Sequence, residues 1–191
     1  MKHALESATI TLVLALLVGV GFASNGEFQQ PQEAENLEWE ATVHAEMYDD
    51  QGDLVWEDTQ ENTLTYEGEN YFRSLAIGEV SNNINYIALS NSTNYQKNKD
   101  HNYLQGEVTC CNLTRQEAAI QKIDDGEWSL QVVWTAGGAV DGVKAAGLFP
   151  HDVQGTTDSD DNILVAEATM AEKTFREDYR FELEWNIQLS S

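Results

Sequence analysis

The sequence predicts an all-β protein, a single antiparallel β-sandwich of jelly-roll-like topology with one short helix, preceded by an N-terminal hydrophobic segment. Three observations predict this fold class. Apolar and polar residues alternate with a period of two in several segments, helical periodicity is found in one segment, and turn residues separate the segments. A length of 191 residues with 41% hydrophobic content is enough for one domain with a core.

Residues 1–23 predict a signal peptide or a membrane anchor. Residues 8–23 form an uncharged apolar run, longer than a typical signal core and slightly short of a comfortable membrane span. Gly21-Phe22-Ala23 before Ser24 offers a small-residue cleavage site, so both alternatives stay open. In either case we expect an exported protein at a virion or cell surface, or free in the extracellular space. Residues 8–23 are then the segment that contacts a membrane.

Residues 24–36 predict a polar linker, and residues 37–191 predict the β-sandwich domain. Within that domain, residues 38–47 alternate strictly and predict a strand with one buried and one acidic face. Residues 49–53 predict a turn, after which residues 54–56 begin the return strand of a hairpin.

The middle of the chain contains the predicted helix and a long loop. In residues 67–76, Tyr71 and Leu75 stand four positions apart, as do Phe72 and Ala76, which predicts one short helix. Residues 84–89 predict a strand. Residues 90–102 are polar and rich in asparagine, and predict a long surface loop.

The last third of the domain gives the clearest strand patterns. Residues 118–123 and 128–135 predict a hairpin around an Asp-Gly turn, and residues 143–149 and 163–170 predict two more strands. Residues 179–189 alternate most regularly, which predicts a central strand. The apolar faces of these strands predict a core that contains Trp39, Trp128, Trp134, Phe181 and Trp185.

The charge of the chain limits its partners. Ten basic residues stand against 33 acidic residues, a formal net charge of −23. Such a surface repels a phosphate backbone, so we expect no nucleic-acid partner. Two interpretations of the acidity stay open, namely adaptation to high salt (a halophilic protein) and ordinary solubility charge at an extracellular surface.

A metal site is the one site prediction that the residues offer. Asp158, Asp160, Asp161 and Asn162 bring oxygen donors of the kind that Ca²⁺ prefers into one short segment. They lack the spacing of an EF-hand loop, and an ordinary acidic turn is the alternative. The adjacent Cys110 and Cys111 have no histidine pair at ligand spacing, so we expect two buried or half-buried thiols. In a strand, their side chains would point to opposite faces.

No motif in the sequence predicts catalysis. The chain has no G-x-S-x-G nucleophile motif, no glycine-rich phosphate loop and no HExxH-type metal motif. Its 33 carboxylates identify no general acid/base pair. We therefore expect a protein that is not an enzyme, with no catalytic residue, no cofactor-binding residue and no cofactor apart from the Ca²⁺ candidate.

The order of segments in residues 70–191 resembles phage and archaeal-virus virion proteins of the tail-fibre type. The resemblance rests on the strand Tyr86-Ile87-Ala88-Leu89-Ser90-Asn91, the elements Leu104-Gln105-Gly106-Glu107 and Leu113-Thr114-Arg115, the segment Gly147-Leu148-Phe149 and the final strand around Trp185. It implies a structural protein of a virion. An export segment is a departure from such proteins, which usually lack one.

Two functional classes therefore remain. The first is a non-enzymatic, exported structural protein that assembles with copies of itself and with other virion or surface proteins, in a tail, a capsid-associated structure or a surface filament. The second is an exported carbohydrate- or receptor-binding module that uses loops 90–106 and 136–162. Tyr95 and Tyr103 are the aromatic residues of the first of these loops that could contact a sugar.

Overall fold

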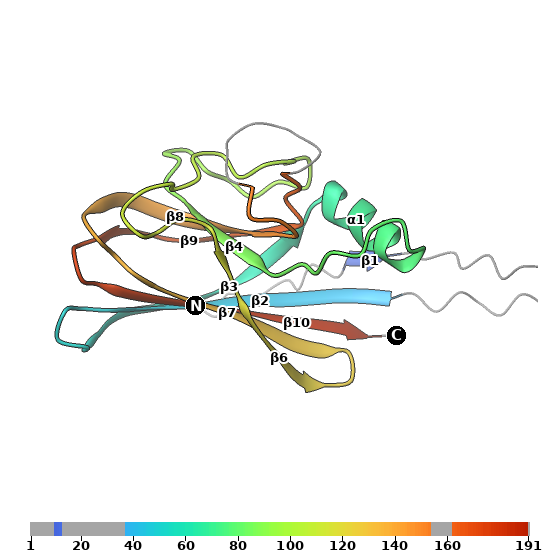
Figure 1. Ribbon diagram of the computed structural model, residues 1–191, viewed down its shortest axis with the longest axis horizontal. Coiled ribbons are helices and arrows are strands. Elements are labelled where there is room, and N and C mark those ends of the chain that lie inside the picture. The colour runs from blue at the N-terminus through green and yellow to red at the C-terminus, as the bar shows by residue number, and fades with distance from the viewer. Residues whose placement is uncertain (1–9, 13–36, 154–161, 191) are drawn as a thin grey trace, which may run out of the picture.

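The computed structural model describes residues 10–12, 37–153 and 162–190 (Figure 1). The helix α1 spans Tyr66–Ala76. The strands are β1 (Ile10–Leu12), β2 (Leu37–Tyr48), β3 (Leu54–Leu64), β4 (Tyr86–Ser90), β5 (Gln116–Glu117), β6 (Ala119–Asp124), β7 (Glu127–Thr135), β8 (Val140–Phe149), β9 (Ala166–Phe175) and β10 (Arg180–Ser190). The predicted all-β fold with one short helix is confirmed. Most of the predicted N-terminal segment (residues 1–23) and all of the polar linker (residues 24–36) lie outside the described residues.

The strands form one continuous antiparallel sheet in the order β5-β4-β8-β9-β3-β2-β10-β7-β6, with β1 beside β2. The sheet folds over into two layers (Figure 1). We call β3, β2, β10, β7 and β6 layer A, and β3, β9, β8, β4 and β5 layer B.

Strand β3 belongs to both layers. Its first part pairs with β2, from Leu54 opposite Tyr48 to Glu61 opposite Thr42. Its last residues, Asn62–Leu64, pair instead with β9. Strand β3 therefore leaves β2 at Asn62, and it carries the sheet from one layer into the other.

The opposite ends of the sheet are joined by a single residue. Strand β5 ends at Glu117 and β6 begins at Ala119, although they lie at the two ends of the strand order. Ala118 between them is buried, and its N–H donates to Asn85 O at 2.7 Å. This connection nearly closes the sheet around the core.

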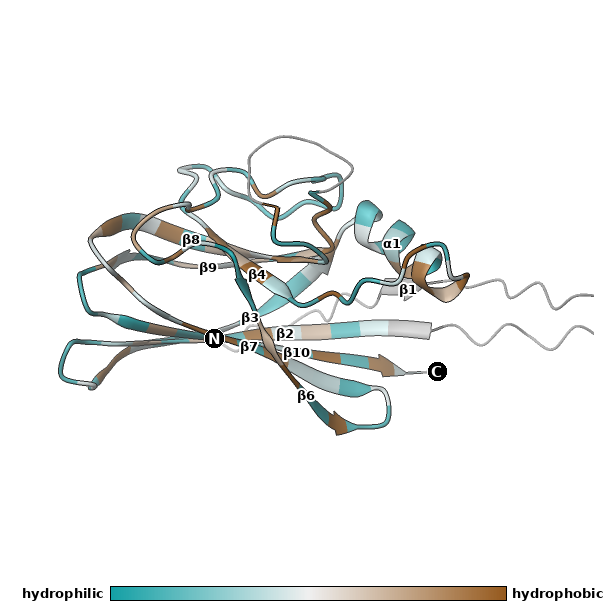
Figure 2. Ribbon diagram, in the orientation of Figure 1, coloured by the Kyte–Doolittle hydropathy of each residue, from teal (hydrophilic) through white to brown (hydrophobic). Residues whose placement is uncertain are grey.

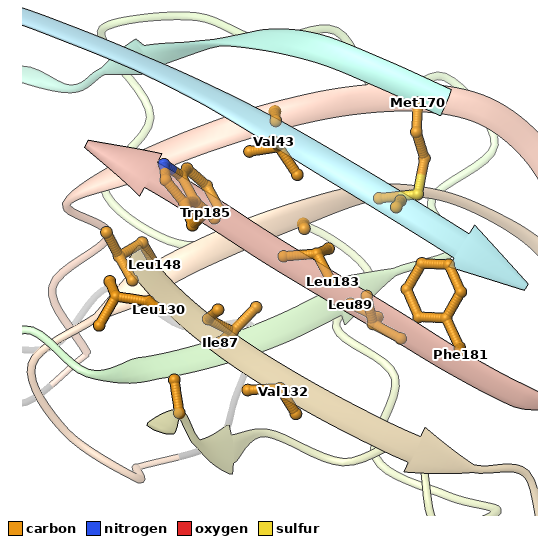
Figure 3. Packing of buried hydrophobic residues seen from close by; sticks show 14 of the residues in the cluster. Val43, Ile87, Leu89, Leu130, Val132, Leu148, Met170, Phe181, Leu183 and Trp185 are labelled. Atoms are coloured by element: carbon orange, nitrogen blue, oxygen red, sulfur yellow. The ribbon is translucent and has the colours of Figure 1, made fainter. Parts of the chain in front are cut away.

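The core lies between the two layers. In Figure 3, Val43, Leu183 and Trp185 of layer A approach Ile87 and Leu148 of layer B. All five side chains are at most 3% exposed. Because layer A turns one face to this core, hydrophobic and hydrophilic residues alternate along β10 (Figure 2).

Most predicted elements are confirmed. The helix, the hairpin of β6 and β7, and the central place of β10 between β2 and β7 agree with the sequence patterns. Gly126 in that hairpin turn has φ +78°, a conformation that glycine adopts without steric cost. Of the predicted core residues, Trp128 alone is only partly buried, because it lies at an open end of the sandwich.

Some strands differ from the sequence patterns in extent. The sequence predicts only the start of β3, which continues to Leu64 although most of its side chains are exposed and show no clean alternation. Strand β8 begins at Val140, whereas the pattern predicts residues 143–149. Strand β9 begins at Ala166 and runs to Phe175, whereas the pattern predicts residues 163–170. Among the described residues, no helix is long and apolar enough to cross a membrane.

Candidate assembly interface

An apolar groove opens where helix α1 covers one end of layer A. Its volume is about 250 Å³. The residues that line it are mostly aromatic and aliphatic and come from β2, α1, β6, β7, β10 and the segment after α1: Trp39, Phe72, Leu75, Asn82, Asn83, Ile84, Ile120, Trp128 and Ile187. The free energy falls when a partner removes such a surface from water.

Local sequence fixes the helix above this groove. Thr65 is the N-cap residue of α1, and its Oγ1 accepts a hydrogen bond from Gly68 N at 2.9 Å. The same hydroxyl donates to Leu164 O, and Thr65 N donates to Val165 O at 3.0 Å, so two bonds tie the helix start to the segment that leads into layer B. A Cβ on Gly68 would lie 2.0 Å from Val165 O, so only glycine permits this approach. Phe72 of the anchored helix then packs against Trp39, with ring centroids 5.0 Å apart.

Trp39 carries an unmet hydrogen-bond donor at the groove. The residue is 4% exposed, and its ring also meets Trp128 at 6.3 Å. Its Nε1 is buried and has no acceptor within the described chain, whereas the Nε1 of Trp134 donates to Thr114 O at 2.8 Å. A buried donor without a partner costs about 1–3 kcal/mol.

Beside the groove, β2 has an edge that β3 does not cover. Strand β3 pairs with β2 only from Thr42 onward, so residues 37–41 are free of β3 on that edge. Over these residues β10 occupies the other edge. In the described chain, β1 alone pairs with the open edge, with Ile10 opposite Trp39 and Leu12 opposite Leu37.

Asn62 marks the point at which β3 leaves β2. With its amide nitrogen turned toward Ala41 O, the distance is 3.2 Å, and the amide oxygen then accepts from Trp185 Nε1 at 3.1 Å. One side chain thus satisfies a backbone carbonyl that the departing strand no longer reaches. The edge on the N-terminal side of Ala41 has no such substitute among the described residues other than β1.

The outer face of layer B is very different, because residues 91–115 cover it. Glu167 of β9 points into this cover and is fully buried. Its carboxylate accepts hydrogen bonds from the Tyr95 hydroxyl and from Asn98 N, and it lies 2.9 Å from His101 Nδ1. Burial, and then the charge of Glu167, raise the pKa of Tyr95 above its usual value.

A buried ion pair fixes the other end of the cover. Arg115 Nη2 and Nε donate to the two oxygens of Glu107 at 2.8 and 3.0 Å, and both side chains are inaccessible to solvent. The guanidinium also donates to His151 O at 3.1 Å and stacks on Phe149 at 3.5 Å. Burial lowers the pKa of Arg115, and the neighbouring Glu107 carboxylate opposes that fall.

Only one of the four predicted calcium ligands lies among the described residues. Asp158, Asp160 and Asp161 lie outside the described residues. Asn162 is described: it is 2% exposed, and its Oδ1 accepts from Arg115 Nη2 at 2.9 Å. Asn162 Oδ1 therefore already contacts a cationic group of the chain, the guanidinium of Arg115. Calcium binding by the segment stays a prediction, and no cluster of three metal-ligating side chains occurs among the described residues.

The aromatic residues predicted for sugar contact occupy other positions. Tyr95 is 7% exposed and bound to Glu167, so it presents no free ring face. Tyr103 is partly buried in the cover. The aromatic rings that line the groove are Trp39, Phe72 and Trp128, which the sequence predicts in the core and in the helix.

The two thiols lie in a turn and not in a strand. Cys111 has φ +60°, which brings its side chain next to that of Cys110, with Sγ atoms 2.6 Å apart. Cys110 is exposed and Cys111 is partly buried. The hydrogen bond to Cys110, and then burial, raise the pKa of Cys111. The prediction of opposite faces is therefore wrong, because a left-handed residue replaces the strand.

Comparison with protein families, with curated proteins and with solved structures finds no match to this chain. The groove, the open edge of β2 and the unmet Trp39 donor define a class of site, namely a surface that a further strand or an apolar partner would complete. Sequence analysis missed this site, since its rings look like ordinary core residues. The one available signal was the position of Trp39 at the start of a strand.

Proposed function

We propose that this chain is a non-enzymatic structural subunit that assembles with copies of itself and with other proteins of an extracellular structure, in a virion or on a cell surface. The observation that carries the proposal is the groove end of layer A. There an apolar surface and a buried donor without an acceptor lie beside a strand edge that β3 leaves and that only the three residues of β1 pair with. A partner that adds a strand and an apolar surface would stabilise all three features.

The charge of the chain shapes how such subunits associate. A net charge of −23 opposes contact between copies, because like charges repel over about 10 Å at 0.1 M salt. The groove lining contains no charged side chain, so contact there buries no unpaired charge. We therefore expect salt or divalent cations to strengthen assembly by screening the rest of the surface.

The sequence supports the extracellular setting. Residues 1–23 predict an export signal or an anchor, and residues 8–23 are the segment expected to contact a membrane. The resemblance of residues 70–191 to tail-fibre-type virion proteins favours a virion over a cellular filament. Electron microscopy of the native source, with the chain located in the particles by antibody, tests this setting.

Sedimentation of the purified chain tests assembly itself. We expect oligomers that grow with NaCl or CaCl₂ concentration. Leu75→Gln places a polar group in the groove and should abolish them. Ile77→Gln is the matched control, because Ile77 follows the same helix but is 64% exposed and does not line the groove. A chain that stays monomeric under all these conditions contradicts the proposal.

The groove also favours a second candidate, a carbohydrate-binding module. The partly buried rings of Phe72 and Trp128 beside the amides of Asn82 and Asn83 combine an apolar face with hydrogen-bonding groups, as sugar sites do. Titration with a panel of soluble oligosaccharides, followed by tryptophan fluorescence, distinguishes the two functions. Saturable binding that Trp128→Ala abolishes, in a protein that remains monomeric, supports the module.

A further inference from the structure

We propose that Cys110 and Cys111 form a redox site, in which the two neighbouring thiols are oxidised to a disulfide by a small disulfide and open again on reduction. The oxidising substrate is a low-molecular-weight disulfide of the glutathione type. The site lies in the cover of layer B, away from the groove lining, so the inference does not depend on assembly.

A tight turn brings the two sulfur atoms together. Cys110 O accepts a hydrogen bond from Leu113 N at 3.0 Å, and the two residues between them, Cys111 and Asn112, have φ of +60° and +59°. Positive φ at both central residues is typical of a type I′ turn. The Sγ atoms of Cys110 and Cys111 are 2.6 Å apart. A disulfide bond is about 2.05 Å long, so a small movement joins them.

The backbone of Cys111 is held in a conformation that its side chain does not favour. Asparagine tolerates a positive φ, whereas such a value is uncommon for cysteine. Conformations of this kind persist where neighbouring structure fixes them, and they cluster at functional sites. Here Gly137 N donates to Cys111 O at 2.8 Å, and a Cβ on Gly137 would lie 2.6 Å from Asn112 Nδ2. The connection between β7 and β8 therefore holds the turn that pairs the thiols.

The two thiols have different environments and therefore different roles. Cys110 is exposed, whereas Cys111 is partly buried and its thiol donates to Cys110 Sγ. This hydrogen bond, and then burial, raise the pKa of Cys111. Cys110 is therefore the thiol that a dissolved oxidant reaches first, and Cys111 is the thiol that closes the ring.

The reaction balances with the small disulfide as the oxidant. The thiolate of Cys110 attacks one sulfur of the small disulfide, breaks its S–S bond and releases one small thiolate. Cys111 then gives up its proton, attacks Cys110 Sγ and releases the second small thiolate. The two released thiolates take up the protons that the cysteines lose. Two protein thiols are thus oxidised to one disulfide, and one small disulfide is reduced to two thiols.

The bond formed at this site is reversible and not a structural crosslink. Neighbouring Cα atoms lie about 3.8 Å apart, closer than the distance of about 4.4 Å or more in ordinary disulfides. The strain of such a ring makes its disulfide easier to reduce. A ring of two residues also removes little entropy from the unfolded chain, so it adds little stability. The significance of the pair is therefore its reactivity.

Thiol titration and intact-mass spectrometry test the site in the folded, full-length chain. After incubation with oxidised glutathione, we expect the wild-type chain to lose both thiols and the mass of two hydrogen atoms, with no glutathione retained. Cys111→Ser should keep one bound glutathione, because no second thiol displaces it. Cys110→Ser should react more slowly than Cys111→Ser, since Cys111 is less exposed and holds its proton to higher pH.

The chain unfolded in urea is the matched control, because it has the same two cysteines without the turn. A smaller fraction should close the ring there, and bound glutathione or links between chains should replace it. Reduced glutathione should reopen the ring of the folded chain. Equal closure in urea overturns the inference, as does a folded wild-type chain that keeps both thiols, retains one glutathione or links to a second chain. A bond that no glutathione buffer opens overturns the reversible site as well.

Discussion

The cover of layer B and the groove end of layer A both contain buried polar groups. These groups are hydrogen-bonded in the cover, whereas one of them has no partner at the groove end. In the cover, the carboxylates of Glu107 and Glu167 are fully engaged by donors from the chain itself. At the groove end, the N–H of Trp39 and the edge of β2 have few partners or none in the described chain. The first region is internally complete, and we propose that a partner completes the second.

This difference separates stability from binding. Charged side chains are rarely buried unless they are paired, so the pairs of the cover explain how a long polar segment can lie ordered on a sheet. An unmet donor in an apolar groove has no such role in the isolated chain. We propose that a partner supplies its acceptor, which is why we assign function to the groove and structure to the cover.

The largest expected effect comes from breaking the cover at Arg115. Arg115→Met leaves the buried carboxylate of Glu107 without its cation, and loss of one partner of a buried ion pair costs about 3–5 kcal/mol. Chemical denaturation should show this fall in the free energy of unfolding. The double variant Glu107→Met/Arg115→Met should be less destabilised than Arg115→Met alone, since no unpaired charge remains.

A surface ion pair provides the control for Arg115. Lys122 and Asp125 are joined at 2.5 Å, but their side chains are 72% and 96% exposed. Lys122→Met should leave the free energy of unfolding nearly unchanged, because water replaces the lost contact. If Arg115→Met were as mild as Lys122→Met, the cover would not depend on its ion pair, and the contrast between the two regions would fail.

The next effect concerns Gly68, which links the two regions. Gly68→Ala would place a Cβ against Val165 O, and the helix that carries Phe72 would have to move away from layer B. Overpacking of this kind costs about 1–3 kcal/mol, and assembly should weaken with it. Gly78→Ala is a useful comparison, because Gly78 has open space around it but φ +75°, so backbone strain acts there without a clash. Thermal unfolding and sedimentation measure both variants.

A smaller difference in the free energy of unfolding should separate Trp134→Phe from Trp39→Phe, although both substitutions remove the same atoms. Trp134→Phe removes the donor to Thr114 O, whereas Trp39→Phe removes a donor with no acceptor in the described chain. We expect Trp134→Phe to be the more destabilising by about 1–2 kcal/mol in the monomer. Assembly should show the reverse order, with the greater loss for Trp39→Phe. Equal effects on assembly would mean that the Trp39 N–H is not used by a partner.

The sequence predicted the parts of this molecule that depend on local patterns. Strict alternation identified β2 and β10, and a four-residue spacing identified α1, because each element turns one face to the core. Local patterns predicted only the start of β3, at residues 54–56, and not its end. Its side chains are mostly exposed, so pairing with β2 and β9 holds it in place without any apolar stripe.

The buried ion pairs and the groove could not be predicted in this way. Glu167 alternates like a solvent-facing residue, and only the chain segment that lies over it makes it buried. Glu107 and Arg115 meet within one loop, but their burial depends on Phe149 and Asn162, which are distant in sequence. Likewise, Trp39 and Trp128 share a groove only because β10 lies between their strands.

The last prediction tests the cover through pH, at Tyr95. Its hydroxyl donates to buried Glu167, and burial raises the pKa of Tyr95 in the folded chain above the usual value of about 10. Below about pH 9 both folded and unfolded chains keep this proton, so stability is independent of Tyr95 ionisation. Above about pH 10 the unfolded chain releases it first, and the free energy of unfolding should fall by up to about 1.4 kcal/mol per pH unit from this residue.

Tyr95→Phe provides the comparison for that pH dependence. It loses the hydrogen bond to Glu167 and should therefore be less stable by a constant amount below about pH 9. Burial also raises the pKa of Tyr71 and Tyr86, so some alkaline destabilisation should persist in this variant. Urea denaturation at a series of pH values gives the free energy of unfolding of each chain. The two free energies should converge as the pH rises, because the wild-type chain then loses the stabilisation from its protonated Tyr95 hydroxyl, which the variant lacks at every pH. Parallel curves would mean that Tyr95 ionises as easily in the folded chain as in water, which a sealed cover over Glu167 does not allow.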